Sequence, residues 1–329
     1  MSKEQTEQLM QAADRCLDSS NYTAALDIYI KILEIDPEHD DAYSMMGSVH
    51  GELGNISKAM ECLSKAVQLN SQNADAWLIQ GLIQQKTGNK SLALTSLQHA
   101  VNYANDYDVA HFSLAKLQLE IGDKSHAQNS LQQVIVCNPS HVEAWHLLGT
   151  LYQSNGEFEN ALKCFTTVIG FNPKYIDSLR RIPALQLAVS NVAEAERSAL
   201  NAISACPNDA WVYINMADVR IAQGRLTEAA DFAKKAMEQD RSNIDLVLKY
   251  ADIMEKRGDY EVVLEILRPM LESMPPVHNA VIIFAKFAPF LDMKNEASVL
   301  IGRLRRASNM SEQQIAIIEK ASAWLDQQI

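Results

Sequence analysis

The stretch WHLLGTLYQSNGEFENALKCFTTVIGFNP, residues 145–173, contains two helical patterns in succession. Residues spaced i, i+3, i+4 and i+7 form one face of a first helix: Trp145, Leu148, Gly149 and Tyr152. A second apolar face follows: Phe158, Ala161, Leu162, Phe165 and Val168. Gly156 separates the two patterns, and Pro173 ends the second because proline cannot continue a helix. The stretch therefore predicts a pair of helices joined by a tight turn.

This pattern recurs every 34 residues along the chain. Steps of 34 from Ala161 reach seven further alanines and one valine: Ala25, Ala59, Ala93, Ala127, Ala195, Ala229, Ala297 and Val263. A fixed period of this length indicates supersecondary units stacked along one axis. Small residues are expected where the two helices of a unit cross, at positions such as Gly149 and Ala161. A bulky residue at the repeated alanine should overpack the crossing by about 1–3 kcal/mol.

A unit of this length with W-x-x-L-G-x-x-Y, then Gly, Ala, an aromatic residue and Pro resembles the tetratricopeptide repeat. The resemblance implies an all-α fold, a right-handed superhelical solenoid of antiparallel helix pairs. It covers residues 1–311 as nine units in register: 6–39, 40–73, 74–107, 108–141, 142–175, 176–209, 210–243, 244–277 and 278–311.

Residues 312–329 are expected to form a C-terminal capping helix, because a capping-box pattern begins at Ser311. Its apolar stripe would cover the end of the stack: Ile315, Ile318 and Leu325. Ile317 and Trp324 lie off this stripe. They belong either to a broad buried face or to an exposed patch for self-association.

Two units depart from the pattern. In the sixth, Pro183 stands where other units have Gly or Ala, and it should kink or shorten the first helix at a cost of about 3 kcal/mol. Either neighbouring units hold the kinked helix in place, or the bend widens the groove beside it. The ninth has Pro289 late in its first helix and Asp292 where a glycine is usual, which is typical of an end unit.

Composition limits the classes of function. The 329 residues are 47% hydrophobic and carry a formal net charge of −12, which predicts a folded protein that does not bind nucleic acid or anionic lipid. Without an apolar leader or membrane-spanning run, and with five dispersed cysteines, we expect a cytoplasmic location without disulfides. His141 and His146 have no third ligand at a suitable spacing, so we expect no metal and no cofactor. Motifs of catalytic sites are absent from the sequence, which predicts that the chain is not an enzyme.

The resemblance also implies where a partner binds. In tetratricopeptide proteins the first helices line a concave groove, into which the second, fifth, sixth, ninth and thirteenth residues of each unit point. These positions predict an apolar surface followed by a basic one: Leu78, Ile79, Phe112, His146 and Leu147, then Arg180, Arg181, Asn215 and Lys249. The basic row resembles the carboxylate clamps of peptide-binding relatives. Alternatively, neighbouring aspartates neutralise it within the chain: Asp218, Asp245 and Asp252.

We therefore predict a non-catalytic adaptor or scaffold that binds a partner protein or extended peptide, with an acidic side chain or C-terminal carboxylate as one candidate ligand group. One alternative is a structural scaffold that assembles as a homo-oligomer through the C-terminal helix. Another is a substrate-recruiting subunit of a separately encoded glycosyl- or sulfotransferase. The asparagine ladder of sugar-transferring relatives is not supported, since only Asn215 fits it.

Overall fold

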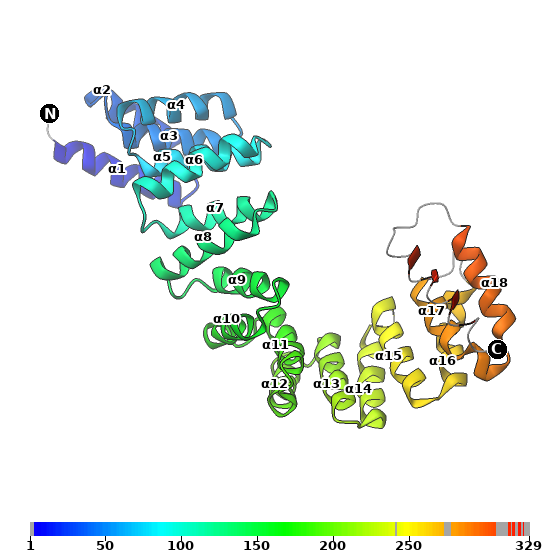
Figure 1. Ribbon diagram of the computed structural model, residues 1–329. Helices are drawn as coiled ribbons and strands as arrows, with labels where there is room; N and C mark the ends of the chain where they lie inside the picture. Colours follow the sequence, from blue (N-terminus) through cyan, green and yellow to red (C-terminus); the bar gives the residue numbers. More distant parts are fainter. Residues whose placement is uncertain are drawn as a thin grey trace. The chain divides into compact units, whose positions relative to one another are not determined.

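The computed structural model describes residues 3–240, 242–272, 278–306, 315–316, 318–319, 322–323 and 325. Within these residues the elements are eighteen α-helices and one 3-10 helix, without a strand (Figure 1). The all-α prediction is confirmed. The chain divides into two compact parts, which we call the N-terminal part, Met1–Asn155, and the C-terminal part, Gly156–Ile329. The division falls between the two helices of the fifth predicted unit.

Helices of the N-terminal part follow one another through short loops, and each packs on the next. They are α1 (Lys3–Asp18), α2 (Tyr22–Ile35), α3 (Asp40–Glu52), α4 (Ile56–Leu69), α5 (Ala74–Lys86), α6 (Lys90–Tyr103), α7 (Asp108–Glu120), α8 (Lys124–Cys137) and α9 (Val142–Ser154).

The C-terminal part continues the alternation. Its elements are α10 (Phe158–Phe171), α11 (Ile176–Ala188), α12 (Val192–Ala205), α13 (Ala210–Ala222), α14 (Leu226–Gln239), α15 (Ile244–Arg257), α16 (Tyr260–Leu271), α17 (His278–Phe287), η1 (Ala288–Leu291) and α18 (Lys294–Arg305). Odd-numbered helices are the first helices of the predicted units, and those of neighbouring units also contact one another within each part, as α3 does α5 and α11 does α13.

The helix crossings explain the repeated small residues. A Cβ atom added at Gly47 would lie 2.6 Å from Cγ of Leu63 and 3.2 Å from the carbonyl oxygen of Ala59. At Gly81 the corresponding distances are 2.7 Å to Leu97 and 3.3 Å to the carbonyl oxygen of Ala93. The predicted close approach of the two helices is therefore confirmed at both crossings.

The turn inside a helix pair requires a left-handed residue. Gly54 has φ 76° in the turn after α3, and Asp292 has φ 54° at the equivalent place in the ninth unit. Glycine adopts this conformation without a steric penalty, whereas aspartate tolerates it less well. Asp292 therefore preserves the turn at a position where glycine was expected.

The two proline departures have different outcomes. Helix α11 runs through Pro183 and has 13 residues, as do α9 and α13, so the expectation of a shortened helix is wrong. Pro183 is buried, and packing of α11 against α10, α12 and α13 holds the helix together despite the missing hydrogen bond. In the ninth unit α17 ends at Phe287, and Pro289 lies in the tighter helix η1.

The predicted capping segment contributes to the core of the C-terminal part. Ile318 and Leu325 are buried in the same hydrophobic cluster as Phe284 and Ile301. Ile315 is exposed, so the predicted stripe is wrong at this residue. Ile317 and Trp324 lie outside the described residues. Among the helices that the structure describes, none is long and apolar enough to cross a bilayer.

Candidate functional site

Three first helices of the C-terminal part line an open hollow of about 410 Å³. It is lined by residues of α13, α15 and α17: Trp211, Asp245, Leu248, Lys249, Asp252, Asn279, Ile282 and Ile283. These residues occupy the second, fifth, sixth and ninth positions of their units. Residues that the helix crossing does not dictate therefore share one hollow, with an apolar floor and charged side chains around it.

The charged side chains of this hollow are partly paired within the chain. Lys249 Nζ lies 3.6 Å from Oδ1 of Asp218. Lys256 donates a 2.7 Å hydrogen bond to Asp252, and Lys286 Nζ lies 3.7 Å from the same carboxylate. Burial raises the pKa of Asp218, and the neighbouring Lys249 opposes that shift. The lysines thus neutralise carboxylates that are already present.

Arg180, on α11, is engaged still more closely. Its guanidinium forms a two-pronged ion pair with Asp209, in which Nε donates at 2.9 Å. This bond raises the pKa of Arg180. Asp209 also accepts a hydrogen bond from the backbone N–H of Trp211 and caps α13, while the Asn215 amide donates to the Arg180 carbonyl at 2.7 Å. Arg180 and Asn215 therefore fasten α11 to α13.

These contacts bear on the predicted carboxylate clamp. Arg181 lies with its guanidinium carbon 5.8 Å from the centroid of the Phe165 ring, a cation–π distance. Arg180 and Lys249 each face an aspartate of the chain. The geometry favours internal neutralisation for these two residues. Asp209, the partner of Arg180, was not among the aspartates that the sequence singled out.

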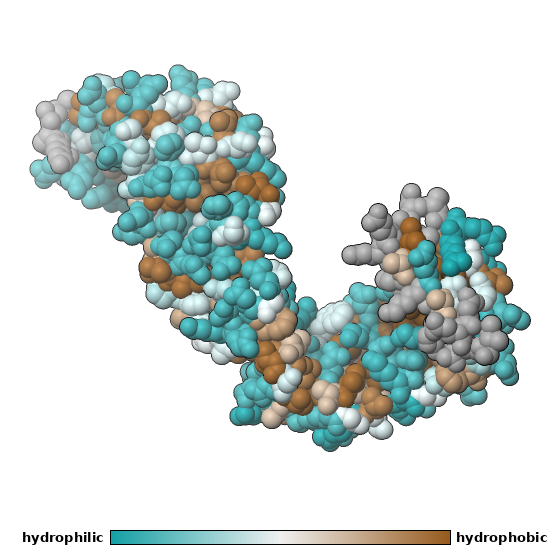
Figure 2. All heavy atoms as spheres, in the orientation of Figure 1, coloured by the Kyte–Doolittle hydropathy of each residue, from teal (hydrophilic) through white to brown (hydrophobic). Residues whose placement is uncertain are grey.

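The N-terminal part offers a different surface on its first helices. Leu82 on α5 and Val109 on α7 are 40% and 49% exposed, and Ile79 and Phe112 beside them are partly exposed. Figure 2 shows apolar side chains reaching the surface of this part among hydrophilic ones. Leu78 is buried in a hydrophobic cluster between α5, α6 and α7, which leaves it little surface for a ligand.

The remaining predicted residues have mixed roles. His146 and Leu147 lie partly exposed on α9, in the N-terminal part. His141 caps α9: its Nδ1 accepts a 3.2 Å hydrogen bond from the backbone N–H of Ala144. Its ring also packs 4.4 Å from that of Phe112. Cys164 is buried, and burial raises the pKa of its thiol to about 11.

Comparison with known proteins agrees with this architecture. The tetratricopeptide repeat family matches residues 17–83 and 220–280, and a second pattern of the same description matches residues 142–175. No curated protein matches the sequence.

Several solved structures share the fold at low identity. A tetratricopeptide repeat protein from Parabacteroides merdae is 15% identical, with 76% of this chain and 99% of that chain covered and a TM-score of 0.60. The C-terminal part of a repeat protein from Cytophaga hutchinsonii is 18% identical. The match covers 73% of this chain and 98% of that chain, with a TM-score of 0.58. A chain in a structure of Naa15/Naa10 bound to HypK-THB is 15% identical. The match covers 98% of this chain and 55% of that chain, with a TM-score of 0.54. With its 34-residue register and tandem helix pairs, the chain is a tetratricopeptide repeat protein.

Proposed function

We propose that the chain is a non-catalytic adaptor that binds a partner protein or extended peptide along the faces formed by its first helices. The observation that carries this proposal is the hollow on α13, α15 and α17. Its lining combines an apolar floor, including Trp211 and Ile283, with polar groups that orient a ligand. The similarity to Naa15/Naa10, solved bound to HypK-THB, supports a protein as the partner.

The hollow favours one kind of ligand group. Lys249 and Asp252 already face opposite charges, whereas Asp245 forms no ion pair among the residues that the structure describes. A ligand that places an apolar side chain on the floor and donates a hydrogen bond to Asp245 leaves the existing pairs intact. An acidic ligand is the second candidate, because Lys249 is 45% exposed and its 3.6 Å contact with Asp218 is long enough to be exchanged.

The N-terminal face would contribute apolar contacts. Leu82 and Val109 lie on neighbouring first helices, and a partner that covers them gains about 25 cal/mol for each Å² of apolar surface removed from water. Both side chains remain outside the packed core, so their replacement by aspartate should leave the fold intact. They are therefore suitable for testing the binding face without unfolding it.

The proposal can be tested with peptides selected from a phage-displayed random library on the full chain. Binding of labelled peptides is then measured by fluorescence anisotropy for the wild type, Leu82→Asp with Val109→Asp, and Asp245→Lys. We expect at least one of these two variants to lose about tenfold or more in affinity for a given peptide. Val136→Asp is the matched control, because Val136 on α8 is 72% exposed and does not belong to a first helix.

The outcomes separate the two ligand classes. Peptides with basic or amide groups that lose binding to Asp245→Lys support the favoured ligand. Acidic peptides that lose binding to Arg181→Glu with Lys249→Glu support the clamp instead. Peptides that bind all of these variants as tightly as the wild type would show that the first helices are not the binding face.

A further inference from the structure

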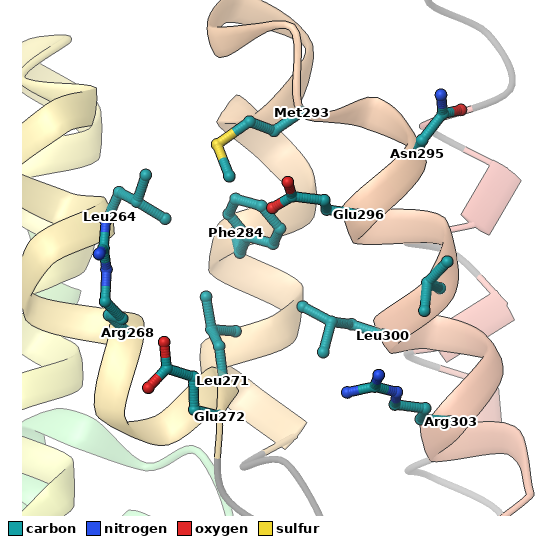
Figure 3. A pocket seen from close by; sticks show the side chains of 11 residues that line it. Leu264, Arg268, Leu271, Glu272, Phe284, Met293, Asn295, Glu296, Leu300 and Arg303 are labelled. Carbon is teal, nitrogen blue, oxygen red and sulfur yellow. The ribbon is translucent and has the colours of Figure 1, made fainter.

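A second hollow, on the opposite helices of the C-terminal part, has the features of a self-association surface. It has a volume of about 560 Å³ and lies between α16 and α18, with α17 beneath (Figure 3). Its apolar lining includes Leu264, Phe284 and Leu300, and Val299 on α18 is 53% exposed at its edge. An apolar centre with a charged rim is the usual anatomy of a protein interface.

The rim carries four charges in an alternating arrangement. Arg268 and Glu272 come from the α16 side, and Glu296 and Arg303 come from α18 (Figure 3). Because α16 and α18 are the second helices of successive repeats, they run in the same direction. In Figure 3 the guanidinium of Arg268 and the carboxylate of Glu296 lie toward one end of the hollow, and the charged groups of Glu272 and Arg303 lie toward the other.

These four side chains form no ion pair with one another or with other residues of the described chain. Several charges on other second helices of the same part are paired within the chain. Glu196 on α12 and Glu228 on α14 are both paired with Arg220, and Arg225 is also paired with Glu228. The rim of the α16–α18 hollow thus presents two positive and two negative groups to a partner.

The alternating arrangement is complementary to itself. Across a two-fold axis parallel to the helices, Arg268 meets the partner's Glu296, and Glu272 meets the partner's Arg303. Across a two-fold axis perpendicular to the helices, Arg268 meets the partner's Glu272, and Glu296 meets the partner's Arg303. Both orientations bring opposite charges together around the apolar centre, which is what a symmetric dimer contact requires. We propose that this surface binds a second copy of the chain.

Sedimentation velocity of the full chain over a wide concentration range at low salt tests this proposal. We expect a monomer–dimer equilibrium that weakens as salt is added, because the rim charges are exposed to solvent. Val299→Glu should abolish the dimer. Val136→Glu, an exposed valine on α8 in the N-terminal part, should leave it unchanged. A wild type that stays monomeric at every concentration would overturn the proposal.

Charge swaps then determine the orientation. Arg268→Glu should weaken the dimer by about tenfold or more, since it places like charges opposite one another. Adding Glu296→Arg restores the dimer if the axis is parallel to the helices, and adding Glu272→Arg restores it if the axis is perpendicular. A dimer that survives Arg268→Glu, or that neither swap restores, contradicts the proposal. Circular dichroism of each variant verifies that it is folded.

Discussion

The third and fourth units, in the N-terminal part, and the seventh unit, in the C-terminal part, differ in how they satisfy the same polar position of the repeat. The eleventh residue of a unit faces the second helix of that unit. In the third and fourth units this residue is glutamine, and a buried serine donates a 2.8 Å hydrogen bond to it: Ser96 to Gln84 and Ser130 to Gln118. These two units thus use neutral pairs that stay within one helix pair.

In the seventh unit the equivalent residue is Arg220, which is buried. It donates a 2.6 Å hydrogen bond to Glu196 on α12, and its Nε lies 3.1 Å from Glu228 on α14 without the alignment of a hydrogen bond. One side chain therefore links three helices. The repeat fixes where a polar group must be satisfied, while the local sequence decides whether the solution is neutral or charged, and this choice sets its energy and pH dependence.

The largest expected effect is the difference in unfolding free energy between two leucine variants, Arg220→Leu and Gln118→Leu. Arg220→Leu leaves Glu196 without its cation and Glu228 with Arg225 alone, and it should destabilise the chain by about 2–3 kcal/mol, because the arginine is buried but the carboxylates are partly exposed. Gln118→Leu removes one neutral hydrogen bond and should cost about 1 kcal/mol. Urea unfolding followed by circular dichroism measures both. Equal costs would show that the charged cluster is no stronger than the neutral pair.

Glycine-to-alanine changes test the packing that the parts share. Gly81→Ala in α5 places a Cβ atom 2.7 Å from Cγ of Leu97 and should destabilise the chain by about 1–2 kcal/mol. Gly170→Ala in α10 meets nothing within 4 Å and should stabilise it by about 0.5–1 kcal/mol, since alanine favours the helix. Thermal unfolding measures both changes, a lower melting temperature for Gly81→Ala and a higher one for Gly170→Ala. A stabilising Gly81→Ala would refute the account of the helix crossing.

Much of this fold follows from sequence because the repeat encodes it locally. The alanine at the twentieth position and the glycine or alanine at the eighth position mark the crossings, with Val263 and Pro183 as the exceptions, and the period gives every helix pair. The outcome at Pro183 was not predictable from the helix itself, because neighbouring helices supply the packing that keeps α11 intact.

The candidate site was less predictable, because its side chains are satisfied across repeats. Asp209 lies 29 residues from Arg180 and belongs to the cap of the next unit, so no helical spacing connects them. A polar residue that ends a unit and caps the next helix is the signal that identifies such partners, and His141 is another example. The sequence also does not show how deeply each residue of the first-helix face is buried. The fifth and sixth positions are adjacent, yet Leu78 is buried and Ile79 is partly exposed.

The smallest expected effect is a difference in pH dependence at Glu196. The hydrogen bond from Arg220 lowers the pKa of this carboxyl below its ordinary value. A pKa that is lower in the folded state stabilises the chain above the unfolded-state pKa, and this contribution is lost as the pH falls through the folded-state pKa. Glu196→Gln should therefore be less stable than the wild type at neutral pH, and the gap should close in acid. Thermal unfolding of both proteins from pH 7 to about pH 3 measures that gap.

The neutral pair in the N-terminal part supplies the control. Gln118 does not titrate, so the destabilisation caused by Gln118→Leu should stay nearly constant over the same pH range. Other carboxylates titrate in both members of each comparison, so their effects largely cancel in the difference. A gap for Glu196→Gln that persists unchanged in acid would mean that Glu196 stabilises the chain through its hydrogen bonds and packing, with little contribution from its charge.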